Sequence, residues 1–258
     1  MRDTPFFLAF GDVHNDIGRF AALEEIAAAE GVIVSGDITF AGGVEDALRV
    51  LLPLAGMNPN ILAQIGNMDK GAVTGMLEEK GWNLHRSARR LFPGVYALGL
   101  GASTPTPFRT PSEYPEEVMA GWLDEAYRRG MELFAAERAE IRADPACAGR
   151  EEGGPAARPA DEPVFVLVSH CPPYGTACDR LGNGHPAGSR AVRGFIEERQ
   201  PDLCVCGHIH EARAEDFLGR TRVINPGPLS GGGCVLIYSD KDEEGRLRAE
   251  MKHVHNAG

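Results

Sequence analysis

The chain has 258 residues, of which 43% are hydrophobic, and it carries 37 acidic against 26 basic side chains, a formal net charge of −11. These values fit a globular protein with a sizeable core. The acidic excess argues against a protein that binds a nucleic-acid backbone, because neutralising phosphates requires a surplus of Lys and Arg. No stretch approaches the run of about eighteen apolar residues of a membrane span, so we expect a cytoplasmic protein with no membrane segment.

The first hundred residues alternate short apolar runs with helical stretches. This alternation is typical of βαβ units and a parallel sheet. It predicts strands at 6–10, 32–35, 61–65 and 95–100 and helices at 17–29, 44–55 and 71–80.

A long helix and a polar segment follow. Apolar residues from Met119 to Phe134 recur at helical spacing, which predicts an amphipathic helix over 115–143. The segment 144–163 is rich in Pro, Gly, Ala and charge and predicts a flexible surface excursion. We therefore expect one domain over 1–258 with a helical and flexible insertion at about 103–163.

The remainder of the chain resumes the β pattern. We expect the last three strands to be antiparallel neighbours, because only short turns separate them. The predicted elements are strands at 164–168, 203–206, 222–225, 234–239 and 247–254 and a helix at 189–199.

The six cysteines are scattered without the compact spacing of a disulfide framework, so we expect reduced thiols. Cys204 and Cys206 alternate with His208 and His210, a pattern that would also suit a structural zinc site. In an extended strand, at about 3.3 Å per residue, the outer two would lie roughly 20 Å apart, too far for one tetrahedral ion. Both cysteines are therefore predicted to be core residues. The complete set is Cys147, Cys171, Cys178, Cys204, Cys206 and Cys234.

Five short polar segments follow apolar runs in a fixed order. Each apolar run predicts a buried strand, so each polar segment should lie where a strand ends. Open α/β sheets keep their active sites at that edge. The segments are Asp12-Val13-His14, Gly36-Asp37, Gly66-Asn67-Met68-Asp69, Ser169-His170 and Gly207-His208-Ile209-His210.

The side chains in these segments are ligand types for a pair of divalent ions. Residues two apart in an extended strand point the same way, so Asp12 and His14 should reach one ion together, and His208 and His210 should lie side by side. Two cations about 3.5–4 Å apart need a shared ligand, and the carboxylate of Asp37 suits that role. Imidazoles, carboxylates and one amide match Mn, Fe, Zn or Co better than Ca or Mg.

Each of these residues has a structural alternative when it is taken alone. Asp37 would more often be a helix N-cap or an Asx-turn residue, and Asn67 a turn residue. His170 would more often be a hydrogen-bonded core residue. Asp69 could orient a ligand from behind or cap a helix. The occurrence of five such segments in order favours the metal site.

The ordered segments resemble the calcineurin-like metallophosphoesterase superfamily, whose pattern is Asp-x-His, Gly-Asp, Gly-Asn-His-Asp/Glu, a later His and Gly-His-x-His. The resemblance spans residues 12–210. It implies a four-layer αββα sandwich of two mixed β-sheets flanked by helices, with the terminal strands completing the second sheet. It also implies two divalent metal ions, one held by Asp12, His14, Asp37 and His210 and the other by Asp37, Asn67, His170 and His208.

The chain departs from this pattern at Met68, where the family has a histidine. Methionine cannot donate a proton, so help to the leaving group should be weaker, which favours phosphodiesters or good leaving groups. His185, in the glycine-rich loop 178–190, is the predicted replacement proton donor. Arg180 or Arg190 would then contact phosphate oxygens. A solvated loop with a surface histidine is an equal alternative.

The sequence therefore predicts a metal-dependent phosphoric ester hydrolase, specifically a phosphodiesterase. A metal-bound hydroxide would attack the phosphorus of a small phosphorylated substrate. The alternative is a non-catalytic metal-binding interaction scaffold of the same fold, which the presence of all seven candidate ligands disfavours. The sequence leaves the natural substrate open and leaves open whether the chain forms a homo-oligomer.

Overall fold

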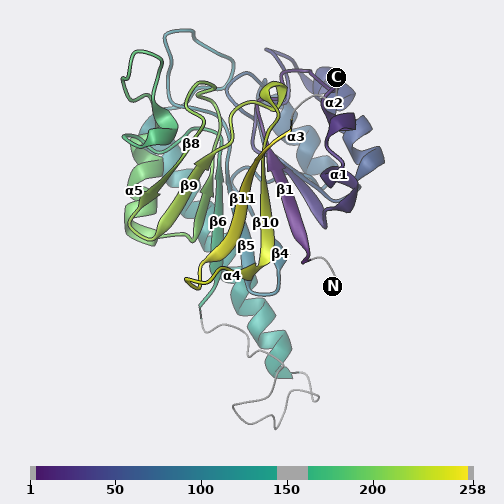
Figure 1. The fold of residues 1–258 in the computed structure, drawn as a ribbon, viewed down its shortest axis with the longest axis vertical. Coiled ribbons are helices and arrows are strands. Elements are labelled where there is room, and N and C mark those ends of the chain that lie inside the picture. The colour runs from purple at the N-terminus through teal and green to yellow at the C-terminus, as the bar shows by residue number, and fades with distance from the viewer. Residues whose placement is uncertain (1–3, 144–161, 255–258) are drawn as a thin grey trace.

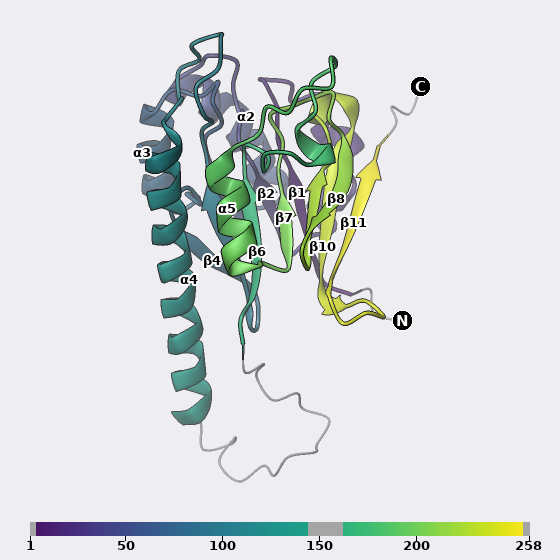
Figure 2. The ribbon, with the colours of Figure 1, turned by 90° about the vertical axis from the view of Figure 1, so that its left-hand side faces the viewer.

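The computed structural model describes residues 4–143 and 162–254. Two mixed β-sheets pack face to face, with helices on their outer faces, as Figures 1 and 2 show. The first sheet runs in the order β11 (Leu247–His253), β10 (Gly233–Lys241), β1 (Phe6–Phe10), β2 (Gly31–Val34) and β3 (Ile61–Ala63). The second runs in the order β4 (Ala88–Phe92), β5 (Val95–Leu100), β6 (Val164–Ser169), β7 (Leu203–Val205), β9 (Thr221–Asn225) and β8 (Ala214–Leu218). The predicted αββα architecture is confirmed.

The core has three apolar layers, which the alternation of side chains along the strands creates. Phe7 and Ala9 of β1 point into the layer between the sheets, whereas Leu8 and Phe10 point to the helices. Because successive residues of a strand face opposite sides, a strand covered on both faces must be apolar throughout. The run FFLAF of β1 meets this requirement.

Helices cover the outer face of each sheet. Short α1 (Glu25–Ala28), α2 (Val44–Met57) and α3 (Ala72–Glu79) lie on the first sheet. On the second lie α4 (Glu116–Ala143) and α5 (Arg190–Arg199). Among the helices of the described ranges, none has the length and apolar content that crossing a membrane requires.

Helix α4 crosses over between the parallel strands β5 and β6 and extends past the lower end of the sheets (Figure 2). Its buried residues Met119, Leu123 and Phe134 pack in the same apolar cluster as Tyr96 and Leu98 of β5. Gly130 lets the helix lie close to the sheet, because a Cβ atom at this position would lie 2.7 Å from Leu98 Cδ2. The predicted surface excursion begins where α4 ends, and its residues 144–161 lie outside the described ranges.

Some predicted elements are wrong. The helix expected at 17–29 is interrupted, because Gly18 N donates to Asp16 Oδ1 in a turn, and only a 3₁₀ turn and α1 form. Strands β4 and β8 were not anticipated, because adjacent arginines interrupt the apolar pattern of β4 and β8 lies half-exposed at a sheet edge.

The prediction that the three terminal strands are all antiparallel neighbours is wrong. Strands β10 and β11 are antiparallel partners in the sheet of β1. Strand β9 instead lies parallel to β7 in the other sheet. The turn Pro226-Gly227-Pro228 ends β9, and the chain then passes from one sheet to the other.

His85 should make the fold sensitive to acid. Its Nδ1 accepts a hydrogen bond from Gly101 N at 2.9 Å, and burial, with the neighbouring Arg86 charge, lowers the His85 pKa from 6.5 to about 4. The unfolded chain therefore takes up this proton at a higher pH than the folded chain. Stability from neutral His85 is complete above pH 6.5 and is lost as the pH falls to about 4, by about 3 kcal/mol in all.

The test is denaturant unfolding of the wild type and of His85→Asn between pH 7 and pH 4. Asparagine keeps an acceptor for Gly101 N but does not titrate. We expect the wild type to lose more unfolding free energy on acidification than the variant. Parallel pH profiles would show that His85 does not carry this dependence.

Candidate functional site

The polar segments meet at one edge of the molecule, at the carboxyl ends of β1, β2, β6 and β7. Their donor atoms form two groups, within each of which the atoms lie no more than 4.8 Å apart. The site A group comprises Asp12, His14 and His210, and the site B group comprises Asp37, His170 and His208. Each group combines side chains that follow strands of both sheets, so neither sheet alone could form it.

The backbone reaches these positions through left-handed turns. Asp12, His14, Asp37 and His208 have φ values of 51°, 48°, 48° and 68° and lie beyond their strands. Asp12 and His14 meet in one group, as predicted, but they do so from left-handed turns rather than from an extended strand. His208 and His210 instead enter different groups. Such conformations cost of order 1–3 kcal/mol per residue and cluster at functional sites.

Backbone hydrogen bonds between the first two loops hold this geometry. Asp12 N donates to Gly36 O at 3.0 Å, and His14 N donates to Asp37 O at 3.0 Å. Asn15 N donates to Ile38 O at 3.1 Å. The loops that follow β1 and β2 therefore run side by side, which fixes site A relative to site B.

Asp37 lies between the two groups. Its Oδ2 is 3.7 Å from His14 Nε2, and its Oδ1 is 3.4 Å from His170 Nε2. Met68 N donates to Oδ1 at 2.7 Å. The approach of Asp37 requires glycine at position 66, where a Cβ atom would lie 2.0 Å from Oδ1. One carboxylate oxygen thus faces each group, the arrangement that a shared ligand needs.

Asn67 adjoins site B through its amide oxygen. Asn67 Oδ1 lies 3.0 Å from His170 Nε2, and Asn67 Nδ2 donates to Thr110 Oγ1 at 2.9 Å. Thr110 Oγ1 in turn donates to Glu113 Oε1 at 2.6 Å. These bonds turn the amide oxygen towards His170. The sequence analysis missed Thr110 and Glu113, because no spacing pattern relates this loop to Asn67.

Burial and neighbouring charges shift the pKa values of the site residues in different directions. Burial raises the pKa of Asp12, but the hydrogen bond from His210 and the nearby histidines outweigh it and hold that pKa at about 2. Burial lowers the pKa of His170, but the Asp37 carboxylate outweighs it and raises that pKa to about 9. Burial and the neighbouring His170 lower the pKa of His208 to about 4. The site thus holds the anionic carboxylate of Asp12 against imidazoles.

The donor chemistry fits divalent metal ions. His14 Nε2 and His210 Nε2 lie 3.2 Å apart, so their lone pairs face one another unless a proton or a cation lies between them. Asp12 and Asp37 are buried, and buried carboxylates need a compensating charge. Among the described residues, the buried atoms His14 Nδ1 and His170 Nδ1 have no hydrogen-bond partner. Imidazole and carboxylate donors suit Zn, Mn, Fe or Co.

Asp69 braces the loops from behind. Its carboxylate accepts hydrogen bonds from Ile38 N, Thr39 N and Gly66 N at 3.0, 2.7 and 2.8 Å. Thr39 Oγ1 donates to the same carboxylate at 2.7 Å. Burial and the nearby Asp37 carboxylate raise the pKa of Asp69 to about 6. Asp69 therefore holds the backbone on both sides of site B.

Gln64 joins the two sheets beneath the groups. Its Nε2 lies 3.2 Å from Ser35 O, 3.0 Å from Leu100 O and 3.1 Å from Val168 O. These carbonyls belong to segments that end β2, β5 and β6, and the Gln64 side chain is fully buried. The Gln64 amide therefore holds the carboxyl ends of these strands next to one another.

The loop 178–190, which carries the predicted proton donor, lies next to the segment that bears His210. His185 is exposed and, among the described residues, belongs to neither group. Arg180 Nη1 donates to Gly184 O at 3.2 Å, and the Arg190 guanidinium lies 3.9 Å from the centroid of the Tyr174 ring. Gly182 N donates to Glu211 Oε1 at 3.3 Å, which brings the loop beside His210. The role predicted for His185 stays a prediction.

The cysteines stay apart from the site. Cys204 and Cys206 are buried in the apolar cluster beneath α4 and α5, so their predicted place in the core is confirmed. Burial raises the pKa of the Cys206 thiol. The five cysteines within the described ranges are free thiols, and Cys147 lies outside those ranges.

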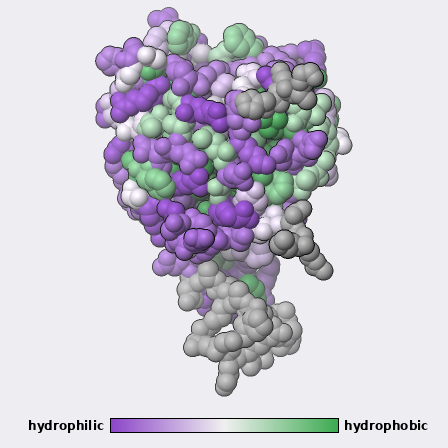
Figure 3. Space-filling view, in the orientation of Figure 1, coloured by the Kyte–Doolittle hydropathy of each residue, from purple (hydrophilic) through white to green (hydrophobic). Residues whose placement is uncertain are grey.

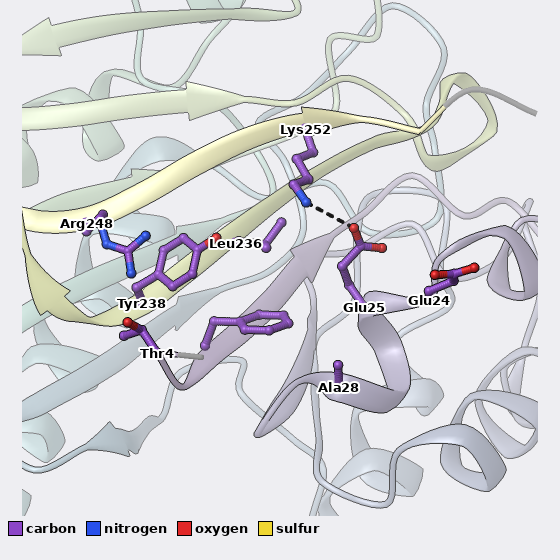
Figure 4. Close-up of a pocket in the computed structure, with 9 residues that line it drawn as sticks. Thr4, Glu24, Glu25, Ala28, Leu236, Tyr238, Arg248 and Lys252 are labelled. Atoms are coloured by element: carbon purple, nitrogen blue, oxygen red, sulfur yellow. Dashed lines mark hydrogen bonds and ion pairs between the residues drawn. The ribbon is translucent and has the colours of Figure 1, made fainter. Parts of the chain in front are cut away.

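A groove of about 600 Å³ lies on the outer face of the first sheet, between β1, β10, β11 and α1 (Figure 4). Three of the charged side chains in its lining are paired: Lys252 Nζ lies 3.2 Å from Glu25 Oε1, and Arg248 Nε lies 2.7 Å from Asp240 Oδ1. The candidate ligands, all of which the structure describes, are absent from its lining. The chemistry therefore belongs to the strand ends rather than to this groove.

Comparison with known proteins identifies a family and a related sequence. A family model described as calcineurin-like phosphoesterase matches residues 7–212. An uncharacterized protein of Methanocaldococcus jannaschii is 30% identical over 217 residues, which are 83% of this chain and 82% of that protein.

Two solved structures share the fold. A protein of Thermus thermophilus has a TM-score of 0.59 at 17% identity, over 98% of this chain and all (100%) of that one. A dimetal phosphatase from Danio rerio has a TM-score of 0.55 at 11% identity, over 98% of this chain and 99% of that one. At such identities the likeness extends to the fold alone.

The contact between Thr110 and Asn67 leads to a prediction about site B. Thr110→Val keeps the shape of the side chain but removes the hydroxyl that orients the amide, whereas Thr110→Ser keeps the hydroxyl. We expect the valine variant to bind one divalent ion about tenfold more weakly, the scale typical of lost ligand-orienting contacts. The serine variant should bind as the wild type does. Equilibrium titration with Mn²⁺ or Co²⁺ measures this, and equal affinities in all three proteins would contradict it.

Proposed function

Because this chain belongs to the calcineurin-like phosphoesterase family, we propose that it is a metal-dependent phosphoesterase acting on a small phosphorylated substrate. One observation carries the proposal. Six of the seven predicted ligand side chains form the two groups, Asn67 adjoins His170, and the two oxygens of Asp37 face one group each. A carboxylate shared between two imidazole groups is the arrangement that a dinuclear hydrolytic centre uses, and turnover distinguishes such an enzyme from a metal-binding scaffold.

The proposed ligand sets follow the two groups. Asp12, His14 and His210 would hold one ion, and Asn67, His170 and His208 would hold the other, with Asp37 shared. When bound, two divalent ions supply Lewis acidity at the phosphoryl oxygens and lower the pKa of water towards neutrality. Met68 N and Gly66 keep the Asp37 carboxylate in its central position. Asp69 holds the loops on which Asp37 and Asn67 lie.

We further propose that the preferred substrates are phosphodiesters or esters with good leaving groups. At position 68 the chain offers the side chain of a methionine, which cannot protonate a departing oxygen. His185 lies on the loop that contacts Glu211 next to His210, and it is our candidate for the missing proton donor. Its exposure leaves it free to move towards a bound ester.

Replacement of Asp37 tests the metal site. We expect the wild type to bind two divalent ions per chain and Asp37→Ala to bind fewer, with turnover of an aryl phosphodiester falling to background. The reason is that the mutual repulsion of two cations is no longer offset by a shared carboxylate. Asp124→Ala, on the exposed face of α4, is the matched control and should keep both ions and full activity.

Elemental analysis and a hydrolysis assay on the same preparations give the result. Full activity of Asp37→Ala under rigorous metal control would overturn the mechanism. Two bound ions without turnover of nucleotides, cyclic nucleotides or phospholipid head groups would favour the interaction scaffold.

His185 can be tested through the leaving group. An alkoxide needs a proton as it departs, whereas nitrophenolate departs without one, so His185→Ala should slow alkyl phosphodiesters about a hundredfold and nitrophenyl esters little. Steady-state rates on a matched pair of esters measure the difference. An equal loss on both esters, or none on either, would remove His185 from the mechanism.

A further inference from the structure

We propose that Phe40 is a binding platform for an aromatic group of the substrate, placed beside site A. The inference rests on the proposed phosphoesterase function and adds the chemical class of the esterified group. The Phe40 side chain is 67% exposed. Its ring centroid lies 6.0 Å from that of His14, with an interplanar angle of 67°. A large apolar ring thus lies in water directly against a candidate metal ligand.

The loop around Phe40 is firmly held. Thr39 N and Thr39 Oγ1 both donate to the buried Asp69 carboxylate at 2.7 Å. Gly42 N donates to Thr39 Oγ1 at 3.0 Å, and Ala41 between them has a left-handed φ of 58°. The backbone is fixed on both sides of Phe40. The exposure of the ring is therefore a property of a rigid loop rather than of a chain end that could fold over it.

Other exposed apolar side chains lie around the same edge. Ile17 is 44% exposed on the loop that runs beside the Phe40 loop, two residues beyond the Asn15 N to Ile38 O hydrogen bond. Phe108 is 84% exposed, two residues before Thr110, whose hydroxyl contacts Asn67. Figure 3 shows hydrophilic and apolar groups intermixed over one face, with some apolar groups at its upper edge, the end towards which β1 runs in Figure 1.

This arrangement selects a class of ligand. Binding sites for small organic molecules combine apolar walls with a few polar groups that fix orientation. Here the charged groups would take the phosphate, and the Phe40 ring would take an organic substituent close to the phosphorus. Flat aromatic groups pair with an aromatic side chain at centroid distances of about 4.5–7 Å, in stacked or edge-to-face geometry. An aryl or nucleobase-bearing ester therefore fits better than an aliphatic one.

The test measures binding separately from turnover. Zn-loaded protein is titrated with phenylphosphonate, cyclohexylphosphonate and methylphosphonate, which share the charged head and are not hydrolysed. We expect the wild type to bind the phenyl compound about three- to tenfold more tightly than either of the others, the scale of one aromatic pair. Phe40→Leu should lose this preference without changing the affinity for methylphosphonate, and Phe40→Tyr should retain it.

The control is Phe217→Leu. Phe217 is 48% exposed on β8, and the guanidinium of Arg246 lies 5.5 Å from the centroid of its ring. Arg246 belongs to the turn between β10 and β11, at the end of the sheet where β1 begins. This variant should therefore behave as the wild type does with all three compounds.

Three results would overturn the proposal: a phenyl preference that survives Phe40→Leu, equally tight binding of the cyclohexyl and phenyl compounds, or an equal loss of affinity for all three in the leucine variant. If the proposed phosphoesterase function is wrong, the experiments would give a different result. In that case the phenyl preference would persist and depend on Phe40, while the metal-loaded wild type hydrolysed no ester.

Discussion

The side-chain carboxamide of Gln64 links the two sheets beneath the site, so that ligand residues from both sheets lie together. Its Nε2 faces backbone carbonyls of Ser35, Leu100 and Val168, which belong to three different strand ends. Buried carbonyls need donors, and the amide NH2 has two, while Leu100 O also accepts from His170 N at 2.8 Å. Ser35 leads into Asp37, and Val168 leads into His170. The strand ends as well as the loops therefore set the distance between these two ligand candidates.

A second constraint is the close approach of backbone to carboxylates. Gly66 leaves room for Asp37, and Gly207 leaves room for Asp12, where a Cβ atom would lie 2.4 Å from Oδ2. His208 N lies 3.1 Å from the same Asp12 oxygen. Backbone thus contacts both buried carboxylates from the other loops. The loops therefore supply hydrogen-bond donors to the buried carboxylates as well as ligands.

The sequence was informative where chemistry and chain order coincide. The polar residues after apolar runs identified the strand ends, and the structure brings the same seven side chains together. The geometry was less predictable. The alternation of side chains along a strand could not predict the left-handed φ values at Asp12 and His208, since neither residue is a glycine. The bonds from Thr110 and Gln64 were equally hidden, because both residues reach groups more than twenty-five positions away in the chain.

The left-handed residues have a consequence for the evolution of this chain. At Asp12, His14, Asp37 and His208, the backbone adopts a conformation that glycine would occupy with less strain. The residues that the chemistry requires are therefore not those that the backbone prefers. Loss of the proposed activity would remove the selection that keeps them. A lineage without that activity could then drift towards glycine at these turns and gain a more stable fold as it does so.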